Sequence, residues 1–294
     1  MENRLEILKT YKIFIGGEFP RTESGRYYKL INSNNKVIAN LCRSSQKDVK
    51  NAVSAATKVF KNWSEKTAFN RSQILYRIAE MLEGRKDQFI TELMLQGSSK
   101  VNAIEEVNLS IDRIIYYAGW CDKYSQVFSS VNPVSSSHFN FTKLEPMGIV
   151  GIIAPKSTSL IGLVSTVMPI LAGGNVCVVL ASEEQPLCAI TFAEIIHSSD
   201  VPGGVFNIVT GYESELKTIF GSHMEINALL YGNPICDNFK EMQKDAVMNL
   251  KRVFNYDIDW RKQNSQNPYF IIDFQEIKTT WHPVDNYGSS SNGY

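Results

Sequence analysis

The sequence has no excess of charge of either sign. Its 294 residues include 30 lysine and arginine side chains and 30 aspartate and glutamate side chains, so the formal net charge at pH 7 is zero. Proteins that bind nucleic acid or an anionic membrane surface gather an excess of Lys and Arg on one face. The balanced composition therefore argues against nucleic acid and membrane as partners.

Long apolar runs are also missing. No stretch approaches the roughly 20 consecutive apolar residues that a transmembrane helix needs. Residues 1–12 are charged and lack the apolar centre of a signal peptide. We therefore expect a cytoplasmic protein. The 44% share of hydrophobic residues is that of an ordinary globular protein, and the length is enough for one large or two modest domains.

Cysteine and histidine are few and scattered. There are five cysteines, an odd number, and none forms a Cys-x-x-Cys pair, so neither a disulfide framework nor a zinc site is indicated. The cysteines are Cys42, Cys121, Cys177, Cys188 and Cys236. The four histidines show no ligand spacing either, and we expect no metal site.

Short apolar runs rich in β-branched residues occupy the middle of the chain. Residues 149–153 and 176–180 are continuously apolar, as expected of central strands that are buried on both faces of a parallel sheet. Residues 159–171 are apolar enough for a buried helix between them, with Pro155 before it and Gly173-Gly174 after it. The pattern predicts a strand, a crossover helix and a second parallel strand.

The alternation continues with a predicted helix at 185–197 and a strand at 206–209. Repeated βαβ units predict an α/β fold, with a Rossmann-like core that we place at residues 146–253. Before this core, residues 1–130 predict a strand and helix region, and residues 131–145 contain a further strand. Residues 254–284 form a carboxyl-terminal segment, and residues 285–294, rich in Ser and Gly, are expected to be a disordered tail.

Local signals refine these regions. Residues 11–19 predict two strands joined by a Gly-Gly turn, and Ser45-Gln-Lys-Asp48 predicts a helix start of the capping-box type. Residues 126–137 predict a loop because they are rich in Ser and contain Asn132-Pro133. Further helices are predicted at 70–83, 87–96, 101–118 and 242–252, and extended structure at 138–144 and 269–281.

Several phrases of this chain follow one another in the order typical of one enzyme family. They are Glu-Pro-Met-Gly-Ile-Val-Gly-Ile-Ile-Ala-Pro at 145–155, Val-Pro-Gly-Gly-Val-Phe-Asn-Ile-Val-Thr-Gly at 201–211, and Asn-Leu-Lys-Arg-Val at 249–253. The chain resembles the coenzyme domain of aldehyde dehydrogenases. The resemblance implies an NAD(P)-binding fold, with strands in 131–145 and 254–284 that join the sheets of neighbouring subunits.

The chain departs from the family pattern at positions that carry chemistry. Lys156-Ser157 stands where the family has Trp-Asn, whose amide helps to hold the oxyanion, and Leu180 stands where the family has a lysine that reaches the adenosine ribose. Glu213 replaces a glycine near the dinucleotide pyrophosphate, where like charges would repel. Residues 230–233 replace Phe-Thr-Gly-Ser.

The usual nucleophile is missing from this sequence as well. After Val253 the chain reads Phe-Asn-Tyr-Asp where the family has Glu-Leu-Gly-Gly with its general base, and no cysteine follows Cys236. Covalent aldehyde oxidation needs a thiolate that attacks the carbonyl. We therefore expect no catalytic residue in this chain. Its shortened pattern resembles the carboxyl-terminal module of family-16 aldehyde dehydrogenases.

Two interpretations follow from the resemblance. The first is a catalytically inactive scaffold or regulatory subunit that forms a homodimer, or a complex with a complete aldehyde dehydrogenase, through its edge strands. The alternative is an NAD(P)-dependent aldehyde oxidoreductase of altered mechanism or a nucleotide-binding sensor. In that case Ser157, Glu183, Gly211 and Gly232 would be the remnants of a cofactor cleft, although glycines also serve turns and Glu183 could be a solvated acid.

Overall fold

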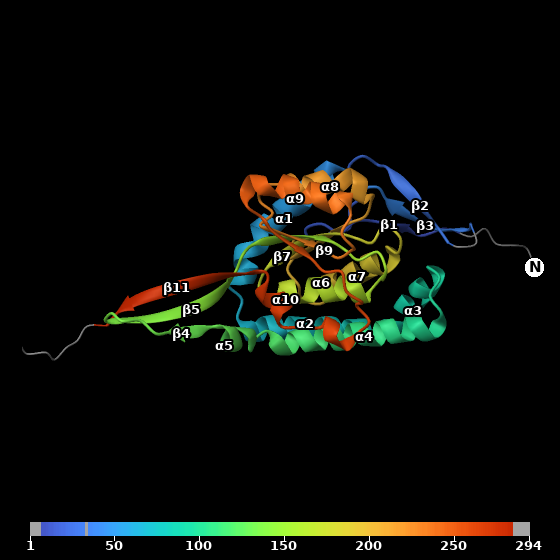
Figure 1. The fold of residues 1–294 in the computed structure, drawn as a ribbon. Helices are drawn as coiled ribbons and strands as arrows, with labels where there is room; N and C mark the ends of the chain where they lie inside the picture. The colour runs from blue at the N-terminus through green and yellow to red at the C-terminus, as the bar shows by residue number, and fades with distance from the viewer. Residues whose placement is uncertain (1–6, 33–34, 285–294) are drawn as a thin grey trace, which may run out of the picture.

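A five-stranded parallel sheet forms the centre of the molecule (Figure 1). The computed structural model describes residues 7–32 and 35–284. The strand order is β10-β9-β6-β7-β8, so the chain builds one half of the sheet and then crosses back over its first strand. The strands are β6 (Ile149–Ile153), β7 (Val176–Leu180), β8 (Phe206–Val209), β9 (Ala228–Tyr231) and β10 (Arg252–Asn255). The predicted α/β fold with a Rossmann-like core is confirmed.

Four of the five strands are almost entirely apolar because both of their faces are covered. Every residue of β6, β7, β8 and β9 is buried. Helices supply the cover, since parallel strands need crossover connections that lie on the faces of the sheet. Burial on both sides removes the need for alternating polarity.

Helices form layers above and below the sheet (Figure 1). One face carries α1 (Gln46–Ser64), α8 (Glu213–Ser222) and α9 (Asp237–Ala246). The other face carries α6 (Ile161–Ala172) and α7 (Leu187–His197), with α2 (Ala68–Glu83), α3 (Lys86–Leu95) and α4 (Lys100–Trp120) packed outside them. All residues of α6 are buried because it lies between the sheet and this outer layer.

A small sheet lies beside the central one. Its order is β1-β3-β2, with β1 (Thr10–Tyr11), β2 (Tyr27–Ile31) and β3 (Val37–Cys42). The strand pair predicted at 11–19 is reduced to a single bridge, Ile15 to Glu18, around Gly16 and Gly17, which both have positive φ. The chain then enters α1 through the predicted capping box of Ser45 and Asp48.

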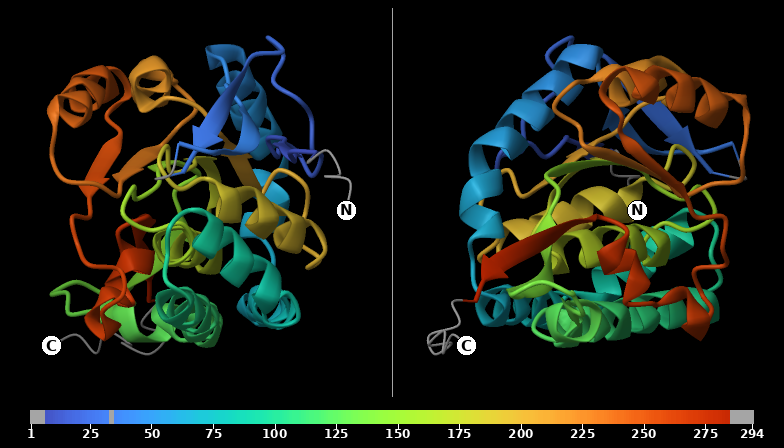
Figure 2. Two further views of the ribbon diagram at one scale, coloured as in Figure 1. Left: turned by 90° about the vertical axis from the view of Figure 1, so that its right-hand side faces the viewer. Right: turned by 60° about the vertical axis from the view of Figure 1, so that its left-hand side comes forward.

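A third sheet extends away from the body (Figures 1 and 2). Its order is β11-β5-β4, with β4 (Ser130–Asn132), β5 (His138–Pro146) and β11 (Gln275–Pro283) in antiparallel register. The prediction of a loop over 126–137 holds for residues 133–137 but was wrong for the first part, which α5 (Tyr124–Phe128) and β4 occupy. Residues 131–145 thus contribute to two strands.

Two carboxyl-terminal predictions need correction. The helix predicted at 242–252 ends earlier, since α9 stops at Ala246, a 3₁₀ turn covers Val247–Asn249, and Leu250 has a φ of 54° before β10 begins. The apolar start of the segment predicted to be extended at 269–281 is instead the short helix α10 (Tyr269–Ile272), whose Ile271 is buried. A second 3₁₀ turn covers Gln263–Ser265. The tail predicted at 285–294 lies outside the described residues.

Candidate functional site

The candidate site lies at the carboxyl ends of β6 and β9. These strands are neighbours in the sheet although the chain visits β7 and β8 between them, so the direction of winding reverses here. In open parallel α/β sheets, ligands bind in the crevice outside the carboxyl ends of the strands at such a reversal. The loops after β6 and β9 therefore decide what the site can accept.

Asn233 ties these two loops together. Its side-chain carbonyl accepts a hydrogen bond from the Lys156 amide at 2.7 Å, and its side-chain amide donates to the Ala154 carbonyl at 3.1 Å. Asn255 at the end of β10 donates to the Asn233 carbonyl at 2.7 Å. Gly232 lets the loops approach, because a Cβ there would lie 2.8 Å from Pro155. The loops are thus bonded directly to each other across the reversal.

A buried carboxylate lies at the start of α8. Glu213 is 2% exposed, and its Oε1 accepts hydrogen bonds from the Tyr231 hydroxyl at 2.7 Å and the Asn238 amide at 3.1 Å. Its Oε2 lies 2.8 Å from Lys156 Nζ. The backbone N–H of Glu213 donates to Glu183 Oε2 at 3.2 Å. One N–H at the positive end of α8, which is suited to anions, is therefore already paired with a carboxylate of the same chain.

The charge on Lys156 is controlled by two opposing effects. Partial burial disfavours the ammonium, but the hydrogen bond and negative charge of Glu213, with Glu183 farther away, outweigh this penalty and raise the pKa of Lys156. Burial, together with hydrogen bonds to Cys236 and Glu213, raises the pKa of Tyr231. Lys156 therefore carries a positive charge that balances Glu213.

The predicted cofactor residues all lie at this edge, but local contacts already account for three of them. Glu183 caps the first N–H of α8, Gly232 packs on Pro155, and a Cβ on Gly211 would lie 3.3 Å from the Ser44 amide nitrogen. Ser157 is exposed and makes no hydrogen bond to any residue the structure describes. The sequence analysis named none of Tyr231, Asn233 or Asn238 individually, although the departure at 230–233 pointed to this loop.

Most thiols in the chain are inaccessible. Cys42, Cys121, Cys177 and Cys188 are buried, and burial raises the pKa of Cys121 to about 12 and those of Cys177 and Cys188 as well. Cys236 is exposed and lies at the N-cap of α9, with its Sγ 3.0 Å from the Tyr231 hydroxyl oxygen.

Two further classes of feature were sought over residues 7–32 and 35–284. In this part of the chain no group of three or more His, Cys, Asp or Glu side chains is placed to hold a metal ion. No helix described there is both long and apolar enough to cross a membrane.

Comparison with known proteins identifies similar chains. The model of the aldehyde dehydrogenase family matches residues 20–231. Cytosolic 10-formyltetrahydrofolate dehydrogenase of Mus musculus is 31% identical over 256 residues, which are 85% of this chain and 28% of that protein. Omega-crystallin of Enteroctopus dofleini is 32% identical over 256 residues, 85% of this chain and 51% of that protein.

A solved structure of an aldehyde dehydrogenase is also similar to this chain. The NAD+ complex of an aldehyde dehydrogenase from Bacillus cereus superposes with a TM-score of 0.79 at 26% identity, and the match covers 84% of this chain and 50% of that one. The chain thus spans about half or less of the length of the relatives it matches.

Proposed function

The chain belongs to the aldehyde dehydrogenase family, and from this premise we propose that residues 1–294 act as a non-catalytic scaffold or regulatory subunit that assembles through its edge strands. The partner is a second copy of this chain or a complete aldehyde dehydrogenase. The proposed compartment is the cytoplasm. The observation that carries the proposal is the buried Glu213 carboxylate, which is paired with Lys156 at the start of α8.

A dinucleotide fits this edge poorly. Its pyrophosphate would bring negative charge toward a helix start where Glu213 is buried and Glu183 already accepts the first N–H. Like charges in a partly buried site repel, and Lys156 already balances Glu213. We therefore propose that NAD and NADP do not bind, and we derive no catalytic step that uses them.

The thiols support the same proposal. A nucleophilic cysteine works as an accessible thiolate, but four of the five cysteines in this chain are buried. The exposed one, Cys236, lies on the connection between β9 and α9, before Val253 and not in the segment after it where the resemblance leads us to expect a nucleophile. Among residues 7–32 and 35–284, no cysteine combines the exposure and the sequence context of the family's nucleophile.

The extended sheet supports the assembly half of the proposal. Among the described residues, strand β11 pairs only with β5, and Ile277 and Trp281 are 62% and 57% exposed on the same face of β11. An edge strand offers unpaired N–H and C=O groups, which favours pairing with a strand of another chain. The two exposed apolar side chains would be covered by such a partner.

Nucleotide binding is tested by calorimetric titration of the purified chain with NAD and NADP. We expect no heat of binding for the native chain. Glu213→Gly removes the carboxylate and should permit weak binding, whereas Ser214→Gly, at the next position of the same helix, should not. Micromolar binding to the native chain, or NAD-dependent oxidation of an aldehyde by it, would refute the non-catalytic proposal.

Assembly is tested by gel filtration with light scattering, alone and after co-expression with a complete aldehyde dehydrogenase. We expect a dimer or a mixed complex that is lost in the double variant Ile277→Lys/Trp281→Lys. Thr280→Lys places a lysine on the opposite face of β11 and serves as the control. If the chain is a monomer and does not bind the co-expressed enzyme, the proposed scaffold function is ruled out.

A further inference from the structure

A cavity of about 240 Å³ lies between the small sheet and the loop that leads into β2. The loop supplies Arg21, Thr22, Gly25 and Arg26, and the sheet supplies Thr10 and Asn40. None of the residues that line it comes from the central sheet or from the connections between its strands. The cavity is therefore distinct from the edge at Glu213.

The floor of the cavity is one face of the small sheet. Thr10 pairs with Asn40 across β1 and β3, and Tyr27 pairs with Cys42 across β2 and β3. Residues two apart on a strand point to the same face, so Asn40 and Cys42 share this face while Leu41 is buried on the other. The floor thus offers a hydroxyl and an amide, and Tyr27 adds an exposed ring at the rim.

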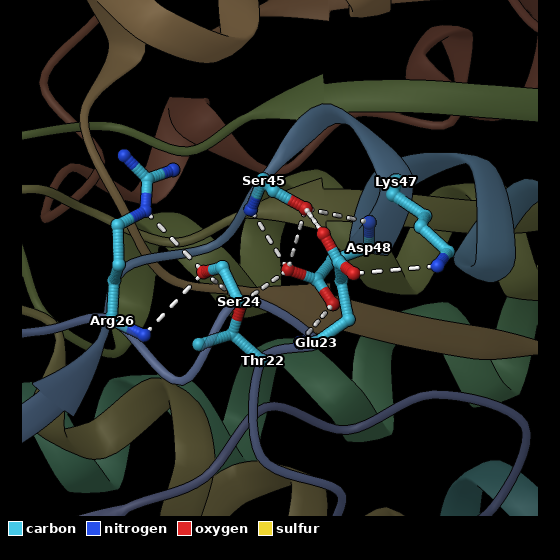
Figure 3. A network of polar contacts seen from close by, with 7 residues as sticks. All are labelled: Thr22, Glu23, Ser24, Arg26, Ser45, Lys47 and Asp48. Atoms are coloured by element: carbon cyan, nitrogen blue, oxygen red, sulfur yellow. Dashed lines mark hydrogen bonds and ion pairs between the residues drawn. The ribbon is translucent and has the colours of Figure 1, made fainter.

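The loop above the floor is held in place by the buried carboxylate of Asp48 (Figure 3). Asp48 accepts hydrogen bonds from the Thr22 hydroxyl and from the Glu23 amide at 3.1 Å, while it also closes the capping box of α1. A turn from Thr22 to Gly25 follows, and the Arg26 carbonyl accepts from the Arg43 amide at 3.0 Å. The backbone that carries both arginines is therefore fixed before any ligand arrives, which reduces the entropy cost of binding.

Neither guanidinium group forms an ion pair with an acidic side chain in the part of the chain that the structure describes, although the charge of Arg26 contributes to lowering the pKa of Glu215. Arg26 donates from Nε to Ser24 Oγ at 3.3 Å, and Figure 3 shows its guanidinium extending away from Glu23 and Asp48. Arg21 makes no hydrogen bond or ion pair with the described residues. Glu23 is already engaged by Lys47 and the Ser45 hydroxyl. The cavity is thus bordered by two arginines that form no ion pair with the described residues.

We propose that this cavity binds the phosphate group of a small phosphorylated metabolite. Guanidinium forks bind phosphate oxygens in two-point contacts, and hydroxyl and amide groups complete such a site. The volume is below the roughly 300–1,000 Å³ of pockets for drug-sized ligands. A phosphomonoester of sugar size fits this limit better than a dinucleotide.

Titration calorimetry with ribose 5-phosphate tests the site, with unphosphorylated ribose as the matched neutral ligand. We expect the phosphate ester to bind and ribose not to bind. Arg21→Gln and Arg26→Gln should each weaken binding about tenfold or more, because each removes charge-assisted hydrogen bonds. Arg77→Gln, which removes an exposed arginine from α2, should leave binding unchanged.

Location is checked independently by hydrogen exchange, in which ribose 5-phosphate should slow exchange at residues 21–27 and at 40–42. Both substituted arginines are exposed, so circular dichroism should show native folding in every variant. The proposal is overturned if neither ribose 5-phosphate nor inorganic phosphate binds at millimolar concentration. It is equally overturned if binding survives in both cavity variants, or weakens as much in Arg77→Gln. These outcomes do not depend on NAD binding or on assembly.

Discussion

Two lysines at opposite ends of the central sheet experience opposite electrostatic conditions. Lys156 follows β6 at the carboxyl end, where its Nζ lies 2.8 Å from Glu213 and its pKa is raised. Lys251 precedes β10 at the amino end, where its ammonium donates only to the neutral amide oxygen of Asn249. Burial lowers the pKa of Lys251 to about 8, and the attraction of Asp245 is too weak to prevent it.

The difference shows that the presence of a carboxylate partner affects the pKa of a partly buried lysine more than burial does. Both ammonium groups lose water, but only Lys156 gains a carboxylate that offsets the loss. The carboxyl end is therefore a balanced internal ion pair, and the amino end holds a cation at a net penalty. Because the ammonium of Lys156 is already paired with Glu213, it is not available to bind an anionic cofactor, and this supports the proposal that none binds there.

The largest expected effect comes from removing the balancing acid. Glu213→Ala leaves the Tyr231 hydroxyl, the Asn238 amide and Lys156 without their acceptor. We expect the free energy of unfolding to fall by about 3 kcal/mol in urea denaturation followed by circular dichroism. Glu241→Ala removes an exposed acid that pairs with Lys217 and should cost about 0.5 kcal/mol or less. Equal losses of unfolding free energy in Glu213→Ala and Glu241→Ala would show that the buried acid contributes no more to stability than the exposed one.

A smaller effect of opposite sign is expected at the amino end. Lys251→Met removes a cation that the folded state disfavours at neutral pH. The shift from an ordinary pKa of about 10.4 to about 8 sets an upper limit of about 3 kcal/mol on the gain in stability at pH 7. Thermal unfolding at pH 7 measures this gain, with Lys244→Met on the exposed surface of α9 as the control. A destabilised Lys251→Met protein would show that packing of the lysine stem matters more than its charge.

The pH dependence of the native chain gives a further test at Lys251. Between pH 8 and about 10.4 the unfolded chain holds a proton on Lys251 that the folded chain has released, so the contribution of Lys251 to stability rises with pH. Denaturant midpoints measured across this range should rise more in the native chain than in Lys251→Met. Parallel curves would refute the lowered pKa.

The smallest effect is expected at Lys156, which is 35% exposed and therefore screened by solvent. Its folded-state pKa is raised, so its contribution is complete below about pH 10.4 and is lost as pH rises through the folded-state value. Lys156→Met should reduce stability at pH 7 by about 1 kcal/mol or less and should flatten the decline above pH 10.4. If the stability of Lys156→Met declines above pH 10.4 as steeply as that of the native chain, the decline comes from other titratable groups.

Much of the fold could be predicted from local pattern. The continuously apolar strands at 149–153 and 176–180 and the buried helix between them lie close to their predicted positions, because burial on both faces leaves a direct mark on composition. The capping box at Ser45 was equally readable. The carboxyl-terminal elements were harder, since Tyr269–Ile272 has strand-like composition but forms a helical turn with Ile271 packed inside.

The candidate site was predictable only in part. The sequence identified the edge through Glu183, Gly211, Gly232 and the departure at Glu213. It could not show that Lys156, 57 residues earlier than Glu213, supplies the counter-charge, because ion pairing between distant positions leaves no local pattern. The cavity beneath Arg21 and Arg26 was missed for the same reason: its walls come from three separate segments.

The sequence by itself determined the family, the parallel α/β architecture and the positions that depart from the family pattern. All three can be recognised from apolar runs and from motifs of neighbouring residues. Only the tertiary structure decided how the charges are matched. Among the described residues Glu213 pairs with Lys156, Lys251 has no acid in hydrogen-bonding contact, and the two cavity arginines form no ion pair. The physical reason is that electrostatic energy depends on distance and burial in space, which are fixed only when segments far apart in the chain pack together.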